Sequence, residues 1–324
     1  MRNKAGGKIP VKAPGTQSCG RNFAIILLFP FLFFSCAPKR ISGGDAASTP
    51  GQPVFTDALG RRYAQKEIPC RIVSLNPATT EILFAIGAGE KVVGVTQYCD
   101  YPPETSTRTS VGGFSGATVS LEQVRSLEPD LVILSADMHS RIISLLDGLG
   151  IASFSVEPRN FSQVYDVIAL LGEITGCVPG AEGVIAEMKS KIDGVEERIK
   201  GLKQPTVFWI LGEDPLMTTG PDTFVSETIR LGGGRNIFDD VHEQWPLVSP
   251  EQVLVRKPEW IFREAPAQRS SLFNNPLWQA VPAVREGHVE FINPDILYRY
   301  GPRLADAVVA VAEILHPKFD TIIK

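Results

Sequence analysis

Two segments of the chain share one pattern at a fixed separation. Residues 119–133 read VSLEQVRSLEPDLVI and residues 248–262 read VSPEQVLVRKPEWIF, displaced by 248 − 119 = 129 positions without a gap. In each copy a serine is followed three residues later by a glutamine, which is the capping-box signature of a helix start. A proline and an acid then precede an apolar run of strand character. The repeated unit is therefore a short helix, a tight turn and a buried strand.

Such a unit cannot bury its apolar faces alone, so two distant copies predict two α/β lobes of similar build with a cleft between them. Strand, helix and strand alternate before each copy, which indicates parallel sheets with right-handed crossovers. Between the lobes, residues 179–200 carry apolar side chains at three- and four-residue steps. They predict a helix of about 22 residues, or about 33 Å, that connects the lobes.

The N-terminal segment has the features of an export signal. Its first 35 residues carry five basic side chains and no acid, and they include the apolar run FAIILLFPFLFF before Ser35 and Cys36. This run is too short for a bilayer, which takes about 20 apolar residues, but it suits the hydrophobic region of a signal peptide. A small residue followed by cysteine resembles the cleavage and lipidation site of bacterial lipoproteins. We expect a lipid anchor on Cys36; an ordinary signal peptide or a buried helix is the alternative.

Composition shifts along the chain predict its organisation. The expected segments are a signal peptide at 1–35, a flexible Gly/Ser/Pro/Ala tether at 36–53, a first α/β lobe at 54–177, a connecting helix at 178–203 and a second α/β lobe at 204–324. The whole chain has 32 basic and 36 acidic residues, and removal of the signal leaves 32 − 5 = 27 basic residues, a net charge of 27 − 36 = −9. This balance argues against nucleic-acid binding, which requires a basic surface.

The cysteines suggest neither a disulfide framework nor a metal motif. Of the five cysteines, Cys19 lies in the signal and Cys36 is the expected anchor, which leaves Cys70, Cys99 and Cys177. Because three is an odd number, at most one disulfide can form within the mature chain.

Aromatic residues follow the predicted strands at one edge of each sheet. Tyr98 follows the strand expected at 91–96, Phe114 lies in the loop before the first repeat, and Trp245 lies in the corresponding loop before the second. Ligands of parallel sheets bind beyond the carboxyl ends of the strands, and flat rings there can stack on a flat ligand. The alternative is that these rings pack at the edge of the hydrophobic core and bind no ligand.

Each repeat also places a glutamate in its first helical turn, Glu122 in the first copy and Glu251 in the second. The helix dipole favours an acid at that position, which is sufficient to explain either residue alone. Their symmetric placement suggests in addition that two acids, one per lobe, face the same way.

The segments RIVSLNPATTEILFAIGAGEKVVGVTQYCDYPPE, LEQVRSLEPDLVI, LGGGRNIF and WPLVSPEQVL span much of the mature chain. Together they resemble the substrate-binding proteins of ABC importers for cobalamin, haem and ferric siderophores, and the cobalamin branch most. The resemblance implies the helical-backbone periplasmic binding protein fold, an α/β structure of two similar Rossmann-like lobes joined by one long helix. It implies a periplasmic or extracytoplasmic protein that captures a corrinoid between its lobes, or a haem or ferric siderophore as the alternative.

The resemblance also implies roles for individual residues. Tyr98 falls on the aromatic residue of the YxDYPP motif that contacts the corrin, and Trp245 falls on a second corrin-contacting ring. Phe114 stands where the cobalamin branch has a tryptophan, and Ser135 stands where it has another. In a haem protein, Tyr98 or His242 would be the candidate axial ligand.

Partners are implied in the same way. Glu122 and Glu251 fall on the two acids that dock into arginine pockets of an ABC permease dimer, which works with an ATPase. Cys36 would hold the protein at the membrane through its lipid. The only group bound would be the transported metal chelate, so no resident cofactor and no catalytic residue is expected.

Other chemistries receive less support. His139 and His242 are isolated among four widely spaced histidines, so we expect no bare-metal site. Arg159, Arg299 and Arg303 could face an anionic ligand, but nothing in their local sequence distinguishes them from solvated arginines. The run LGGGRN follows a helix and is interpreted as a helix stop, and no nucleophile elbow or phosphate loop is present, so we predict no enzyme. A ligand sensor or surface adhesin with this fold is the alternative outside transport.

Overall fold

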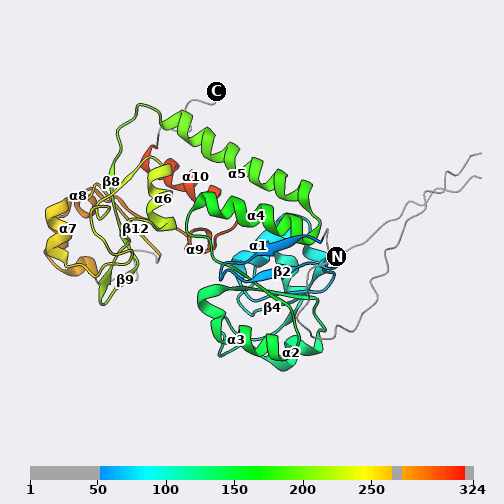
Figure 1. Cartoon of the computed structure of the whole chain (residues 1–324). Helices are drawn as coiled ribbons and strands as arrows, with labels where there is room; N and C mark the ends of the chain where they lie inside the picture. Colours follow the sequence, from blue (N-terminus) through cyan, green and yellow to red (C-terminus); the bar gives the residue numbers. More distant parts are fainter. Residues whose placement is uncertain (1–51, 265–271, 318–324) are drawn as a thin grey trace, which may run out of the picture. The chain divides into compact units, whose positions relative to one another are not determined.

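The computed structural model describes residues 52–264 and 272–317 (Figure 1). The expected signal peptide, Cys36 and most of the tether lie outside these residues. The first sheet has the order β5-β4-β3-β6-β7 and contains β3 (Ile72–Ser74), β4 (Val92–Val95), β5 (Thr109–Ser110), β6 (Leu131–Ser135) and β7 (Ser153–Val156). The second has the order β11-β8-β12-β13 and contains β8 (Thr206–Ile210), β11 (Arg235–Asn236), β12 (Trp260–Arg263) and β13 (Val289–Phe291). All neighbouring strands in both sheets are parallel.

Helices cover these sheets, and two short hairpins flank them. The hairpins are β1 (Val54–Thr56) with β2 (Arg62–Ala64) and β9 (Gly212–Glu213) with β10 (Leu216–Met217). The α-helices are α1 (Pro77–Ala85), α2 (Leu121–Ser126), α3 (Ala136–Gly148), α4 (Phe161–Thr175), α5 (Val178–Ile199), α6 (Phe224–Leu231), α7 (Pro250–Arg256), α8 (Pro282–Glu286), α9 (Asp295–Tyr298) and α10 (Leu304–Leu315). Short 3-10 helices lie at η1 (Gly89–Lys91), η2 (Pro103–Thr107), η4 (Leu272–Asn274) and η5 (Trp278–Ala280).

The sequence repeat folds as a structural repeat, α2–β6 in the first lobe and α7–β12 in the second. Ser120 and Ser249 cap the two helices, each hydroxyl accepting the N–H three residues on at 3.3 Å. In the second copy Gln252 also accepts the N–H of Ser249 at 2.8 Å, which completes the capping box. Equivalent turn positions adopt positive φ in both copies, at Glu128 (φ 44°) and Lys257 (φ 51°).

The acid that follows the proline in each repeat ties the unit to the central strand of its sheet. Asp130 accepts the N–H of Arg71 at 2.9 Å just before β3, and Glu259 accepts the N–H of Thr206 at 3.0 Å at the start of β8. These backbone donors lie at the strand ends, where the ladder does not satisfy them. The repeat therefore sets the register of helix, turn and strand in the same way in both lobes.

Alternation along the strands divides each lobe into two cores. On β6, Leu131 and Ile133 join the core formed with α1, α4 and α5, whereas Val132 and Leu134 join the core formed with α2 and α3. Successive strand residues point to opposite faces of a sheet, which explains this separation. In the second lobe, the strands divide in the same way between a core with α6 and α10 and a core with α7 and α8.

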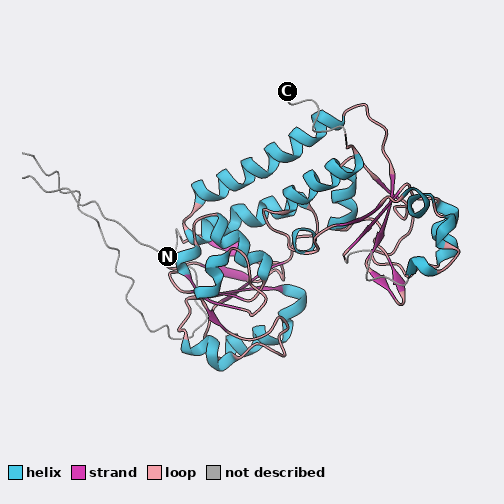
Figure 2. Ribbon diagram, turned by 180° about the vertical axis from the view of Figure 1, so that it is seen from behind, coloured by secondary structure: helices cyan, strands magenta, loops and turns pink. Residues whose placement is uncertain are grey.

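Helix α10 belongs to the cores of both lobes. Leu304 and Val308 join the core of the first sheet, and Ala307 and Val311 join the core of the second. The long helix α5, which connects the lobes in the chain, runs along α4 and α10 (Figure 2). Two similar Rossmann-like lobes joined by one long helix are therefore the observed fold, which confirms the fold class expected from the sequence. In the part of the chain that the structure describes, no helix is long and apolar enough to cross a bilayer.

Candidate functional site

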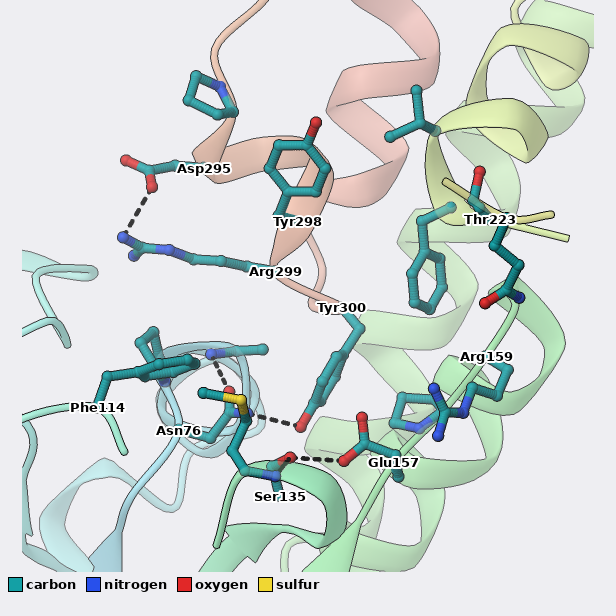
Figure 3. A pocket seen from close by; sticks show the side chains of 18 of the residues that line it. Asn76, Phe114, Ser135, Glu157, Arg159, Thr223, Asp295, Tyr298, Arg299 and Tyr300 are labelled. Atoms are coloured by element: carbon teal, nitrogen blue, oxygen red, sulfur yellow. Dashed lines mark hydrogen bonds and ion pairs between the residues drawn. The ribbon is translucent and has the colours of Figure 1, made fainter. Parts of the chain in front are cut away.

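A pocket of about 610 Å³ lies between the two lobes, at the carboxyl ends of the strands (Figure 3). This volume falls within the range of roughly 300–1,000 Å³ that small-molecule sites occupy. The first lobe contributes Asn76, Pro77, Ala78, Tyr98, Phe114, Ser135, Met138, Glu157, Pro158 and Arg159. The second lobe contributes Asp222, Thr223, Phe224, Val225, Gln244, Trp245, Pro294, Asp295, Tyr298, Arg299 and Tyr300.

The pocket contains all three aromatic residues that the sequence singled out. Tyr98 follows β4, Phe114 follows β5, and Trp245 lies in the loop before α7. Tyr98 and Phe114 meet edge to face with ring centroids 6.2 Å apart. Tyr98 and Trp245 are 50% and 42% exposed, so much of each ring is available to a ligand. Their contact with a ligand stays a prediction.

A buried histidine supports this aromatic wall. The ring of Phe114 meets that of His139 edge to face with centroids 6.3 Å apart, and His139 is completely buried. Its Nδ1 accepts the N–H of Ser135 at 3.2 Å. Burial lowers the pKa of His139, because the charged imidazolium is poorly solvated there. Among the described residues, no group of three His, Cys, Asp or Glu side chains is placed to hold a metal ion.

The part of the pocket around Ser135 is polar. Ser135 ends β6 and caps α3, accepting the N–H of Met138 at 3.3 Å. Its hydroxyl donates to Glu157 at 2.6 Å (Figure 3). The resemblance implies that the cobalamin branch has a tryptophan at the position of Ser135. Here the same position carries a hydroxyl paired with a carboxylate, so it has hydrogen-bonding groups and no ring on which a ligand could stack.

A hydrogen bond between Asn76 and Tyr300 joins the two lobes at the pocket. Asn76 caps α1 by accepting the N–H of Ala78 at 2.8 Å, and its amide donates to the hydroxyl of Tyr300 at 2.9 Å (Figure 3). Tyr300 lies just before α10 and is buried, and burial raises the pKa of its phenol. The two side chains fix the segment before α10 against the start of α1.

Arg299 lines the pocket but does not present a free positive charge. It donates to Glu81 at 3.1 Å, to Asp100 at 2.5 Å and to Asp295 at 2.9 Å. The hydrogen bond from Arg299 lowers the pKa of Asp100. The local sequence did not distinguish Arg299 from a solvated arginine, because its partners come from both lobes.

Arg303 and Arg159 differ from Arg299 in their surroundings. The guanidinium of Arg303 lies over the ring of Tyr101 at 4.1 Å, is largely buried and does not line the pocket. Arg159 is exposed at the pocket and pairs with Asp137 at 2.8 Å. The pocket thus combines aromatic rings with charged groups of both signs.

The two glutamates of the repeat lie away from this pocket. Glu122 and Glu251 are exposed in the first turns of α2 and α7, and neither lines the pocket. The hydroxyl of the N-cap residue Ser249 lowers the pKa of Glu251. His242, the alternative axial ligand, is likewise exposed and outside the pocket lining.

The sequence did not predict a role at the site for Asn76, Glu81 or Tyr300. Asn76 precedes a proline at the first helical position, which is a recognisable N-cap signal. Glu81 is an acid within an otherwise uncharged helix, and an acid there requires a partner if it is buried. Neither signal predicts that the partners come from residues 299–303.

Comparison with known proteins identifies the family. Residues 72–296 match the sequence profile of the family described as periplasmic binding protein. The chain belongs to the periplasmic binding protein family. The ABC transporter substrate-binding lipoprotein YvrC of Bacillus subtilis is 32% identical over 269 residues, which cover 81% of this chain and 84% of that protein. The vitamin B12-binding protein of Photorhabdus laumondii is 30% identical, over 76% of this chain and 88% of its own length.

Solved structures of periplasmic binding proteins have the same fold. The periplasmic vitamin B12-binding protein BtuF of Vibrio cholerae matches 78% of this chain and 99% of its own, with a TM-score of 0.67 and 30% identity. The periplasmic haem-binding protein RhuT of Roseiflexus sp. RS-1 matches 77% of this chain and 99% of its own, with a TM-score of 0.67 and 26% identity. These relatives confirm the family resemblance that the sequence motifs indicated.

Proposed function

We propose that this periplasmic binding protein is the extracytoplasmic substrate-binding component of an ABC importer. It captures a corrinoid such as cobalamin in the pocket between its lobes and delivers it to the membrane permease. The observation that carries this proposal is the meeting of Tyr98, Phe114 and Trp245, from both lobes, in one pocket. Flat aromatic faces pack on a flat macrocycle with little loss of side-chain entropy. Two relatives named above as vitamin B12-binding proteins favour the same ligand.

A haem is the second candidate ligand, favoured by one observation. Tyr98 lines the pocket with a half-exposed phenol, and a tyrosine can ligate haem iron. Tyr298 also lines the pocket, but its hydroxyl already donates to Glu264 and accepts from Trp209. Tyr98 is therefore the axial ligand to test if haem binds. A ferric siderophore is the remaining possibility within the same class of chelates.

The proposal includes a membrane anchor and a docking surface. Cys36 carries the lipid that holds the protein at the membrane. Glu122 and Glu251 dock one lobe each onto arginines of a permease dimer that works with an ATPase. Both glutamates are exposed, which this role requires.

Parallel calorimetric titrations test the ligand. The delipidated protein is titrated with cyanocobalamin, cobinamide, haemin and a ferric catecholate siderophore. We expect tight binding of a corrinoid that Trp245→Ala weakens severalfold or more, since loss of a ring contact costs about 0.5–1.5 kcal/mol beyond the area buried. Leu247→Ala is the matched control, because Leu247 is an exposed apolar residue of the same loop that does not line the pocket.

Binding of haemin or the siderophore without a corrinoid response would reject the corrinoid and retain the transport proposal. Transport itself is tested with the double variant Glu122→Ala, Glu251→Ala. This variant should abolish uptake in cells while ligand affinity in solution stays unchanged. Normal uptake by the double variant would reject the docking role. A ligand-dependent phenotype without any uptake would indicate a sensor or adhesin.

A further inference from the structure

A second hollow lies on the first lobe and is lined by residues of α2 and of the C-terminal part of α3. It has a volume of about 490 Å³. Its apolar side chains are Leu121, Leu145 and Leu149, and Gly148 also lines it. We call this hollow the α2–α3 groove.

Helix α3 turns one apolar face inward and another outward. It buries Ile142 and Leu146 in the core below the sheet, whereas Leu145 and Leu149 are 53% and 41% exposed. Leu145 and Leu149 are four residues apart, so they lie together on one face of the helix. Their exposure leaves apolar surface in water at a cost of about 25 cal/mol per Å². Here the exposed leucines line a hollow with polar groups at its rim, so an apolar side chain of a partner can bury them.

The rim of the groove carries charges of both signs. Glu122 and Arg125 lie three residues apart on α2, and both line the groove and are exposed. In the ion pairs that the structure gives for residues 52–264 and 272–317, neither takes part. A complementary partner would therefore present an apolar side chain between a basic and an acidic one.

We propose that the α2–α3 groove receives an apolar side chain of the permease. The arginine next to that side chain pairs with Glu122, and an acid on its other side pairs with Arg125. The occupant is the permease because Glu122 itself lines the groove. A permease arginine that pairs with Glu122 therefore places its neighbouring permease side chains over Leu145 and Leu149. This inference rests on the proposed transport function and adds an apolar contact to the docking surface.

The groove and the ligand pocket lie at opposite ends of α3. Met138 near the start of the helix lines the ligand pocket, and Gly148 at its end lines the groove. Ten helical residues separate them, or about 15 Å at 1.5 Å per residue. The groove can therefore be blocked without a change at the ligand pocket.

Gly148→Leu is the variant that fills the groove. A Cβ built on Gly148 meets nothing within 4 Å, so the new side chain extends into open space. Gly148 is helical, and leucine is a better helix former than glycine. The matched control is Gly183→Leu, since Gly183 is an exposed helical glycine of α5 with equally open surroundings and lies outside the groove.

Docking is measured by surface binding to the permease–ATPase complex of the host's corrinoid importer, held in lipid nanodiscs. We expect Gly148→Leu to weaken docking about tenfold or more, because it excludes one buried apolar side chain from the interface. Gly183→Leu should dock like the wild type. Cyanocobalamin titration should give equal affinities for all three proteins. Wild-type docking by Gly148→Leu would overturn the proposal.

Two further measurements distinguish a failure of the groove proposal from a failure of the proposed transport function. If the wild type does not dock at all, the transport function itself is wrong and the groove proposal falls with it. If Glu122→Ala weakens docking and Gly148→Leu does not, the function stands and only the groove proposal is overturned. Sedimentation velocity tests whether the groove instead binds a second copy of the chain. If the wild type self-associates and Gly148→Leu abolishes only that self-association, the groove holds a second copy and the proposal is wrong.

Discussion

Arg303, at the start of α10, holds the buried carboxylate of Glu81 on α1. Its Nε donates to Oε2 of Glu81 at 2.8 Å and its Nη2 donates to Oε1 at 2.5 Å, and Arg299 adds a third bond at 3.1 Å. Glu81 is only 2% exposed, so its charge requires such partners. The bidentate geometry is the strong form of an arginine–carboxylate pair. The second lobe is therefore fixed to the first beside the ligand pocket.

Glu81→Gln should destabilise the protein. The amide keeps the shape of the side chain but leaves two guanidinium groups without their shared carboxylate. Removal of one partner from a buried ion pair costs about 3 kcal/mol or more, and we expect a loss of that size in the free energy of unfolding. Urea denaturation followed by circular dichroism measures it.

Asp295→Asn is the control for this prediction. Asp295 also pairs with Arg299, but its side chain is 47% exposed. Exposed pairs contribute about 0–1 kcal/mol, so this variant should unfold almost like the wild type. Equal losses in both variants would mean that Glu81 has no special role in joining the lobes.

The sequence predicted the elements whose boundaries are marked locally. The sequence predicts an amphipathic helix over 161–175 and a helix over 224–231, and α4 and α6 have these bounds. Asn160 caps α4 and Gly176 ends it in the left-handed conformation, and both are local signals. Helix α3 was not predicted, because Ser135 is both the last residue of β6 and the N-cap of α3. No turn residue separates the strand from the helix there.

At the ligand pocket, too, the sequence predicted the residues that have a local signal and missed those that depend on distant partners. Tyr98, Phe114 and Trp245 were found because each follows a strand or precedes a repeat, which are features of nearby sequence. Glu81 and Arg303 are 222 residues apart, so nothing in the neighbourhood of either indicates the other. Ion pairs between residues of different lobes depend on how the two lobes pack together. They can be identified only once the three-dimensional fold is known.

Lipidation of Cys36 is tested by metabolic labelling with an alkyne fatty acid in the native host. The wild type should incorporate the label and fractionate with membranes. Cys36→Ala should lose the label and appear in the soluble extracytoplasmic fraction, because the predicted signal region is too short to hold the protein as a membrane span. Cys70→Ala controls for nonspecific thiol labelling. Equal labelling of the wild type and Cys36→Ala would reject the anchor.

Acidification should destabilise the protein through His139. Burial lowers the pKa of His139 in the folded state, whereas a histidine in the unfolded chain titrates near 6.5. Below that pH the unfolded state binds a proton that the folded state does not, so the free energy of unfolding falls as the pH drops from about 6.5 toward the folded pKa. The loss is at most about 1.4 kcal/mol per pH unit for one proton.

The measurement is urea denaturation at pH 7.5 and pH 5.5 for the wild type and for His139→Gln, which carries no titrating ring. The difference between the two pH values should be smaller in His139→Gln. His242→Gln is the control, because it removes an exposed histidine and leaves His139 in place. Since His139 supports the ring of Phe114 in the pocket, ligand affinity should also weaken at pH 5.5 in the wild type. An identical pH dependence in all three proteins would show that His139 accepts a proton without cost in the folded state.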